Sequence, residues 1–349
     1  MRIKKIYLVP VALIILAIFF GPDLLSNNSD SVSRVLESVG GEEGGGLETD
    51  THPLSIEYMR QQDYPGSDIV IEQELSPGSN YSRQIVSYKS DGLKIYALMT
   101  IPNDRPPEDG FPAIVFNHGY IPPETYRITE KYIAYQDAFA RNGYVTIKSD
   151  YRGHGNSEGK PEGGYFSPAY TIDVLNAVSS IQKYPDVNDE RIGMWGHSMG
   201  GHIALRSMVV TDDIKAGVIW GGVTVSYENM VSNWRRSRPW RPSEHEVNSG
   251  RNTRQDLEDE YGTFDDDRKF WDSITPIKFL PIISGPIQLH HGENDETVPV
   301  EFSETLRDEL ENAEKEVELF VYEGDNHNIS DNLSVALTRS VEFFNKHLK

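Results

Sequence analysis

Short apolar runs alternate with amphipathic stretches along most of this chain, from about residue 80 to its last residue. Eight of the runs have the length and composition of strands, and the stretches between the later runs repeat apolar residues at helical spacing. Strands that alternate with helices predict a mostly parallel sheet with helices on both faces. The predicted strands are residues 83–88, 94–101, 113–117, 144–149, 192–195, 216–220, 287–291 and 317–322, and the predicted helices are residues 131–141, 169–183, 199–210, 301–313 and 333–347.

The sequence GHSMGG at residues 196–201 joins one of these strands to the next helix. Ser198 lies at the junction, and a turn this sharp needs small neighbours, which Gly196 and Gly200 supply. The pattern G-x-S-x-G is that of a nucleophile elbow, a strained turn that holds a serine hydroxyl exposed above a sheet. The alternative is a glycine-rich turn whose serine has no chemical role.

Two further residues with catalytic chemistry follow later strands. In a parallel sheet the reactive crevice lies beyond the carboxyl ends of the strands. Asp295 follows the seventh predicted strand, in HGENDETVP, and His327 follows the eighth, in YEGDNHN. A serine nucleophile needs a histidine to take its proton and a carboxylate to fix the histidine tautomer. Because the order Ser, Asp, His is the one that this architecture uses, we predict that Ser198, Asp295 and His327 form a catalytic triad.

Other polar residues near these positions compete for the same roles: His197, His202, His290, His291 and Asp325. The first two histidines flank the serine, where we expect them to shape the elbow and its helix. The next two end a strand before the acid loop and are poor bases by position. The aspartate lies only two residues from His327, and a carboxylate so near in sequence rarely reaches the imidazole correctly.

Acyl transfer also needs hydrogen-bond donors for the oxyanion of the tetrahedral intermediate. The backbone N–H of Met199, directly after the serine, is the first predicted donor. The second follows the third strand in AIVFNHGY, where we predict the N–H of Tyr120, with the tyrosine hydroxyl as an alternative. The competing interpretation is that NHGY is an ordinary turn.

Taken in order, these motifs resemble the prolyl oligopeptidase-like branch of the α/β-hydrolase superfamily. NHGY is similar to its oxyanion loop, DYRGHGNSEG to the loop after its fourth strand, GHSMGG to its elbow, HGENDETVPV to its acid loop and DNHN to its histidine loop. The resemblance runs from about Tyr81 to the C-terminus. It implies an α/β-hydrolase fold and a serine hydrolase related to acylaminoacyl peptidases and dienelactone hydrolases. Large peptidases of this branch carry a β-propeller, for which residues 51–80 are too few.

Residues 223–272 are long for a connection between a strand and a helix, so we expect a lid insertion that covers Ser198. The segment contains NWRRSRPW and then QDLEDEYGTFDDD. Its arginine–tryptophan cluster could meet an acidic or aromatic substrate group, although pairing with the acids of the lid itself is favoured. This cluster comprises Trp234, Arg235, Arg236, Arg238 and Trp240.

The N-terminus predicts a location. Arg2, Lys4 and Lys5 precede residues 6–20, which are apolar and broken only by Pro10. This is the layout of a secretory signal or signal anchor. Because no small-x-small cleavage site follows, we expect residues 1–25 to form an uncleaved single-pass anchor in the cell membrane, with the catalytic domain extracytoplasmic. Secretion after signal cleavage is the alternative.

The rest of the predicted organisation follows from composition. Residues 26–50 are polar, acidic and glycine-rich and are expected to be a flexible linker to a catalytic domain of residues 51–349. A formal net charge of −21 argues against nucleic acid as a partner. The chain has no cysteine and its histidines are explained without metal, so we expect neither a metal nor a cofactor.

We therefore predict a membrane-anchored serine hydrolase that cleaves a peptide or carboxylic ester bond in a small-molecule or peptide substrate through an acyl-enzyme. A carboxylesterase without peptidase activity is one alternative. A hydrolase-fold binding protein that has lost its chemistry is another.

Overall fold

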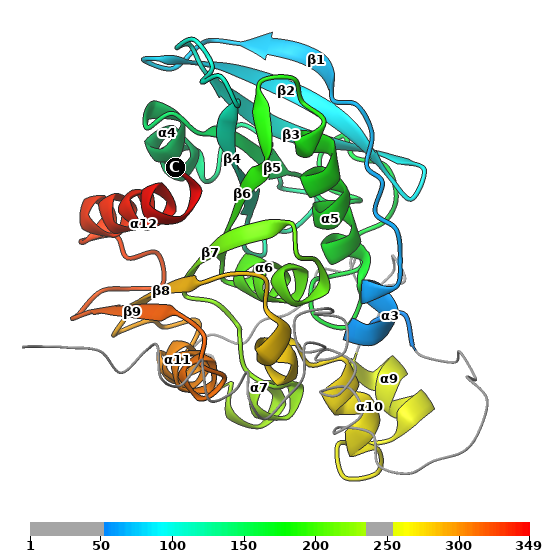
Figure 1. Cartoon of the computed structure of the whole chain (residues 1–349). Coiled ribbons are helices and arrows are strands. Elements are labelled where there is room, and N and C mark those ends of the chain that lie inside the picture. The colour runs from blue at the N-terminus through cyan, green and yellow to red at the C-terminus, as the bar shows by residue number, and fades with distance from the viewer. Residues whose placement is uncertain (1–51, 235–253) are drawn as a thin grey trace, which may run out of the picture. The chain divides into compact units, whose positions relative to one another are not determined.

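A nine-stranded sheet forms the centre of the part of the chain that the computed structural model describes, residues 52–234 and 254–349 (Figure 1). Its strands lie in the order β1-β2-β3-β5-β4-β6-β7-β8-β9. They are β1 (Val70–Leu75), β2 (Tyr81–Ser90), β3 (Leu93–Pro102), β4 (Phe111–Asn117), β5 (Val145–Ser149), β6 (Val187–His197), β7 (Ile214–Trp220), β8 (Ile287–Gly292) and β9 (Val317–Tyr322). The helices are α3 (Ile56–Arg60), α4 (Ile133–Arg141), α5 (Ala169–Gln182), α6 (Met199–Val210), α7 (Tyr227–Asn233), α9 (Arg254–Tyr261), α10 (Arg268–Ser273), the 3-10 helix η2 (Pro276–Ile282), α11 (Glu301–Asn312) and α12 (Leu333–Leu348).

The sheet has a short antiparallel part and a longer parallel part. Strands β1, β2, β3 and β5 pair antiparallel in that order. Every pair from β5 across to β9 is parallel. This arrangement confirms the predicted mostly parallel sheet of an α/β-hydrolase fold, and the eight predicted strands are all present.

The ninth strand, β1, is the one that the sequence analysis missed. Its sequence VIEQEL is exposed along almost its whole length, and it lies at the edge of the sheet. A strand that buries little has no apolar pattern by which to recognise it. Its glutamates also suit an edge, where charged side chains discourage pairing with other chains.

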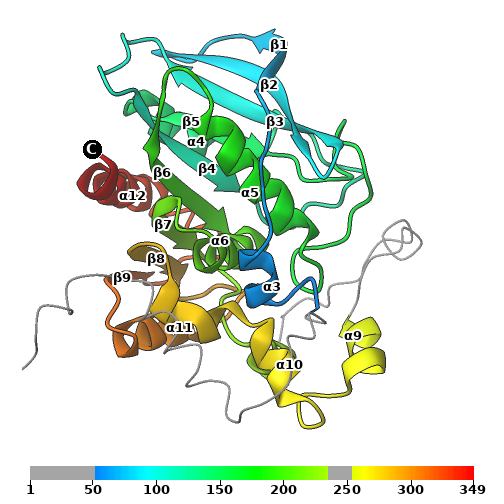
Figure 2. The ribbon, with the colours of Figure 1, turned by 45° about the vertical axis from the view of Figure 1, so that its right-hand side comes forward.

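Helices cover both faces of the sheet (Figures 1 and 2). Helices α4 and α12 pack on one face, in a core cluster with Phe116 and Trp195. Helices α5 and α6 pack on the other, in a cluster with Val115 and Met194. Successive residues of a strand point to opposite faces, which is why neighbours such as Val115 and Phe116 belong to different clusters. With helices on both sides, every residue of β4 is buried.

The carboxyl ends of the parallel strands place the predicted catalytic motifs at one edge of the sheet. Asn117 ends β4 just before Gly119 and Tyr120, and His197 ends β6 just before Ser198. The loops that carry Asp295 and His327 follow β8 and β9 in the same way.

The predicted lid, residues 223–272, is described except for 235–253, and it contributes α7, α9 and α10. Side chains of these helices form a third apolar cluster, which includes Tyr227, Met230, Leu257 and Trp271. Of the arginine–tryptophan cluster, Trp234 is described, whereas Arg235, Arg236, Arg238 and Trp240 lie outside the described residues.

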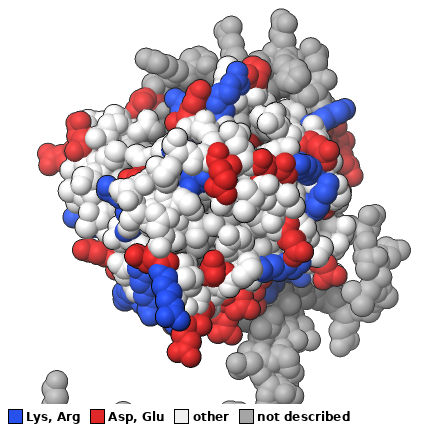
Figure 3. All heavy atoms as spheres, turned by 90° about the horizontal axis from the view of Figure 1, so that it is seen from above, with Lys and Arg blue, Asp and Glu red and all other residues white. Residues whose placement is uncertain are grey.

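Charged side chains of both signs are interspersed on the face seen from above in Figure 3. Elsewhere in the described residues, charged side chains form ion pairs, as Lys94 does with Glu72 at 2.6 Å and Arg141 with Asp137 at 3.3 Å. Exposed pairs of this kind contribute little to stability, typically about 0–1 kcal/mol each.

The structure corrects the predicted location. In residues 52–234 and 254–349, no helix combines the length and the apolar character needed to cross a membrane. The predicted anchor and linker, residues 1–25 and 26–50, lie outside the described residues. This finding contradicts the predicted single-pass location in the cell membrane, and the membrane attachment expected from it is not supported. Residues 6–20 are fewer than the roughly 20 apolar residues of a spanning helix, and Pro10 interrupts them.

Candidate active site

Ser198 has a strained backbone conformation between β6 and α6. Its φ is 56° and its ψ is −120°, in a region that non-glycine residues rarely adopt. Hydrogen bonds hold it there: its N–H donates to the carbonyl of Trp220 at 3.0 Å, and its own carbonyl accepts from the N–H of Gly201 at 2.9 Å. Strain of this kind persists where the surrounding structure over-determines it.

The glycines around the serine are required by close approach of the backbone. A Cβ atom on Gly196 would lie 2.3 Å from the carbonyl oxygen of Gly200. A Cβ atom on Gly200 would lie 2.0 Å from the carbonyl oxygen of Asn117. Because backbone atoms cannot move aside as a flexible side chain can, both positions exclude any larger residue. The glycine spacing therefore reflects how tightly β4, β6 and α6 meet at this turn.

Asp295 and His327 are joined by a hydrogen bond of 2.6 Å between Oδ2 and Nδ1. The other carboxylate oxygen of Asp295 accepts from the N–H groups of Thr297 and Val298, each at 2.8 Å. Burial raises the pKa of Asp295, but the hydrogen bonds from His291 and His327 outweigh it and hold the pKa below its usual value. An ionised carboxylate only accepts hydrogen bonds, so Nδ1 of His327 carries the proton and Nε2 is left as an acceptor.

His291 is a part of this arrangement that the sequence analysis did not assign. Its Nε2 lies 3.1 Å from the same Oδ2 of Asp295 and 2.9 Å from the carbonyl oxygen of Val298. A carbonyl can only accept, so Nε2 carries the proton, and Nδ1 accepts from the hydroxyl of Ser303 at 2.7 Å. The single Nε2–H of His291 is therefore shared between the carbonyl of Val298 and Oδ2 of Asp295, the carboxylate oxygen that the backbone N–H groups do not bind. Its position immediately before the acid loop is the signal that the sequence offered.

The competing acid, Asp325, is occupied within its own loop. Its Oδ1 accepts from the N–H of Asn326 at 2.9 Å, and its Oδ2 accepts from the N–H and the side-chain amide of Asn332, each at 3.0 Å. These bonds shape the turn that carries His327. Asp295 therefore contacts the imidazole of His327, whereas Asp325 stabilises the turn that carries it.

Two of the competing histidines are buried and bonded elsewhere. His202 Nδ1 lies 3.2 Å from the carbonyl oxygen of Val223. His290 contacts the Tyr322 hydroxyl at 2.8 Å and the Gln288 side-chain oxygen at 2.7 Å. Burial lowers the pKa of each to about 3, which keeps both neutral.

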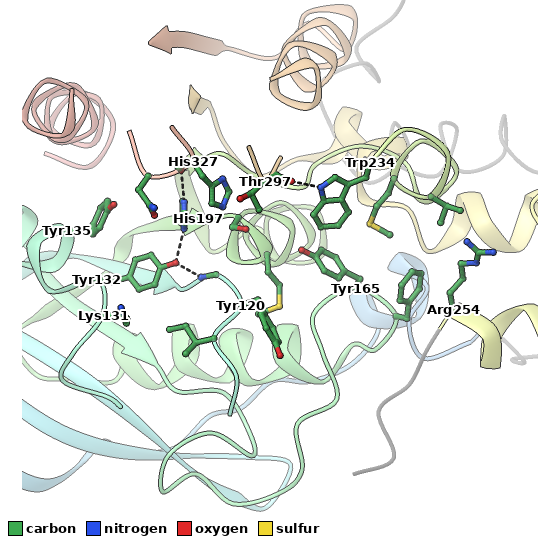
Figure 4. A pocket seen from close by; sticks show the side chains of 18 residues that line it. Tyr120, Lys131, Tyr132, Tyr135, Tyr165, His197, Trp234, Arg254, Thr297 and His327 are labelled. Atoms are coloured by element: carbon green, nitrogen blue, oxygen red, sulfur yellow. Dashed lines mark hydrogen bonds between the residues drawn. The ribbon is translucent and has the colours of Figure 1, made fainter. Parts of the chain in front are cut away.

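A cavity of about 700 Å³ opens at this edge of the sheet, and it brings together Ser198, Met199, Tyr120 and His327 (Figure 4). Asp295 is not part of the lining, but its hydrogen bond to His327 connects it to a residue that is. The rest of the lining is mainly aromatic and apolar, with two cations. These residues are Gly119, Ile121, Lys131, Tyr132, Tyr135, Tyr165, Phe166, His197, Met230, Val231, Trp234, Arg254, Thr297 and Asn328.

The lining divides around the candidate serine and histidine. In Figure 4, Lys131, Tyr132 and Tyr135 lie to one side of His197. On the other side lie Tyr165 and Trp234, with Arg254 beyond them. Trp234 is fixed by a hydrogen bond of 2.7 Å from its indole N–H to the carbonyl of Thr297, which ties the lid to the acid loop.

Comparisons with known proteins show which family the chain belongs to. The model of the prolyl oligopeptidase family matches residues 131–349. The uncharacterized peptidase YtmA of Bacillus subtilis is 26% identical over 251 residues, which cover 71% of this chain and 86% of that protein.

Two solved structures share the fold at lower identity. A puromycin-hydrolyzing peptidase of Mycobacterium tuberculosis superposes with a TM-score of 0.62 at 18% identity, over 78% of this chain and 40% of that one. An acetyl xylan esterase from Paenibacillus sp. R4 superposes with a TM-score of 0.61 at 18% identity, over 82% of this chain and 92% of that one. The chain spans less than half of the first protein and most of the second.

Proposed function

Because the chain belongs to the prolyl oligopeptidase family and is a serine hydrolase, we propose that it cleaves a carboxylic ester or peptide bond through an acyl-enzyme on Ser198. One observation carries this proposal: the strained elbow serine and the histidine paired with Asp295 line the same cavity. One protein with the same fold is named as a peptidase and another as an esterase, which is why the proposal includes both peptide and ester bonds.

In the proposed reaction, Nε2 of His327 takes the proton of the Ser198 hydroxyl as Oγ attacks the substrate carbonyl carbon. The N–H groups of Met199 and Tyr120 stabilise the oxyanion of the tetrahedral intermediate. Asp295 stabilises the imidazolium, which then gives its proton to the leaving alcohol or amine. A water molecule attacks the acyl-enzyme by the same route, releases the acid and restores the serine.

The cavity supports an apolar or aromatic acyl group of moderate size. A volume of about 700 Å³ falls within the range of small-molecule sites, and aromatic walls favour apolar or aromatic groups. Recognition of a free amino terminus would need a carboxylate, because a buried ammonium is costly without a partner. None of the lining residues in the described ranges is an aspartate or a glutamate. We therefore favour esters and N-acylated peptides over substrates with a free amine.

The test uses the full-length chain and a matched set of substrates. The p-nitrophenyl ester and the p-nitroanilide of one N-acetyl amino acid compare ester with amide cleavage. The same pair with a free amine tests the substrate class. We expect hydrolysis of the acetylated ester by the wild type and loss of turnover by about a millionfold in Ser198→Ala. Cleavage of the ester alone would establish the esterase alternative, and activity retained by Ser198→Ala would reject the proposal.

A further inference from the structure

Tyr132, at the start of α4, has an unusual backbone conformation and a side chain that lines the cavity. Its φ is 64° and its ψ is 14°, in the left-handed region that a tyrosine rarely enters. The helix gains no side-chain cap from it. Residues in this region concentrate where a functional arrangement requires them, so the role of this side chain needs an explanation.

The hydroxyl of Tyr132 makes two hydrogen bonds, shown as dashed lines in Figure 4. It accepts from the N–H of Gly119 at 2.9 Å. It also lies 2.8 Å from Nδ1 of His197. The other ring nitrogen of that histidine, Nε2, lies 3.0 Å from the carbonyl oxygen of His327.

The directions of these bonds follow from the carbonyl at the end of the chain. A carbonyl only accepts, so Nε2 of His197 carries the proton. In a neutral imidazole Nδ1 then accepts, and the phenol of Tyr132 must donate to it. Burial, with a smaller contribution from His327, lowers the pKa of His197 to about 3, in keeping with the neutral ring. The single proton of Tyr132 is therefore directed at His197, away from any substrate oxyanion.

The bonds connect three segments that are far apart in sequence. Gly119 belongs to the loop after β4, His197 ends β6 next to the candidate nucleophile, and His327 lies in the loop after β9. The segments also touch closely. A Cβ atom on Gly119 would lie 2.8 Å from the Tyr132 hydroxyl and 3.1 Å from Cβ of Ser198. The rings of His197 and His327 lie 4.6 Å apart between centroids. A shift of any one segment would therefore displace the other two or break their hydrogen bonds.

We propose that Tyr132 and His197 are a pair of positioning residues that fix the oxyanion loop relative to Ser198 and His327. The inference rests on the proposed function, since it assigns a task within the same catalytic site. The pair holds the Gly119–Tyr120 segment against the elbow through the Tyr132 hydroxyl. It holds the backbone of His327 through Nε2 of His197. The donors of the oxyanion hole and the general base thereby keep their spacing as the tetrahedral intermediate forms.

Tyr132→Phe is the main test, because it keeps the ring and removes both hydrogen bonds. With a p-nitrophenyl ester we expect kcat to fall by about 10–100-fold while KM changes by less than about twofold, since misalignment acts on the transition state. The inhibition constant of a trifluoromethyl ketone, whose hemiketal oxygen occupies the oxyanion hole, should rise by a similar factor. Tyr144→Phe is the matched control: this buried tyrosine donates to Asn345 Oδ1 at 2.9 Å, away from the cavity. It should lose melting temperature without losing kcat.

A second set of variants tests whether the two residues act as one. His197→Leu removes both bonds of the ring, whereas His197→Gln keeps one donor and one acceptor and should recover part of the lost kcat. Adding Tyr132→Phe to His197→Leu should cost little more, because the connection is already broken.

The outcomes separate this inference from the proposed function. If the wild type hydrolyses the ester and Ser198→Ala does not, the proposed function stands, and the Tyr132 and His197 variants decide the inference. Wild-type kcat in Tyr132→Phe, a change confined to KM, or fully additive losses in the double variant would each overturn the positioning role.

Discussion

Replacing Asp295 by asparagine should remove catalysis while leaving the fold in place. The reason lies in the four N–H groups that face the carboxylate. Oδ1 receives the N–H groups of Thr297 and Val298, and Oδ2 receives His327 Nδ1 and His291 Nε2. All four partners are donors, and an asparagine side chain offers only one acceptor atom.

The single amide oxygen of Asp295→Asn can accept from only one of these two pairs of donors. If its oxygen faced the histidines, its NH₂ group would point at two backbone N–H groups, and each orphaned N–H costs about 1–3 kcal/mol. We therefore expect the oxygen to stay on the Thr297 and Val298 side. The NH₂ group then faces His327 Nδ1, which must become an acceptor, so the proton moves to Nε2. In that tautomer the imidazole cannot accept the proton of Ser198.

The expected loss follows from this change of tautomer. We expect kcat for a p-nitrophenyl ester to fall by about 10⁴-fold at pH 7. Asp325→Asn is the matched control, because that carboxylate serves only its own loop. It should lower the melting temperature and leave kcat within about tenfold of the wild type. A smaller effect on kcat in Asp295→Asn than in Asp325→Asn would show that the reasoning about Asp295 is wrong.

Three further predictions follow from the same geometry. Because the pKa of Asp295 is lower in the folded protein, its ionised carboxylate stabilises the fold fully above the ordinary pKa of 3.8, and this contribution is lost as the pH falls below that value toward the folded-state pKa. The melting temperature of the wild type should therefore fall more steeply in acid than that of Asp295→Asn. Parallel curves of melting temperature against pH would contradict this. Gly200→Ala should prevent correct folding of the elbow, because its Cβ would lie 2.0 Å from the carbonyl oxygen of Asn117; soluble protein with wild-type circular dichroism and kcat would refute the close approach. Trp234→Ala should lower kcat/KM for bulky aromatic acyl esters more than for acetate esters, since Trp234 lines the cavity; equal losses would mean that its bond to Thr297 has only a structural role.

Most of the eight predicted strands were recognisable because they bury a continuous or alternating apolar run, whereas β9 is only half-buried but has the largely apolar sequence VELFVY. β1 buries almost nothing, so only the pairing of its backbone with β2 identifies it. The apolar run at the N-terminus predicted a location from composition alone. Residues 6–20 are apolar, but they number fewer than the roughly 20 residues that a spanning helix needs.

The residues that meet at the candidate site were predictable only in part. The motifs placed Ser198, Asp295 and His327 after the correct strands, because a parallel sheet gathers the carboxyl ends of its strands. The positions of Tyr132 and His291 depend on contacts between segments far apart along the chain. Tyr132 lay in a stretch whose helical pattern concealed its left-handed backbone, and His291 resembled a packed histidine at a strand end.

Turnover through an acyl-enzyme requires that a covalent acyl group forms on Ser198. Incubation of the full-length wild type with a slowly hydrolysed acyl ester, followed by acid quenching and mass spectrometry of the digested protein, tests it directly. We expect one acyl group per chain, on the peptide that contains Ser198, and no addition to Ser198→Ala. An acyl group on another residue, or turnover of this slowly hydrolysed ester with no covalent species on the wild type, would contradict an acyl-enzyme on Ser198.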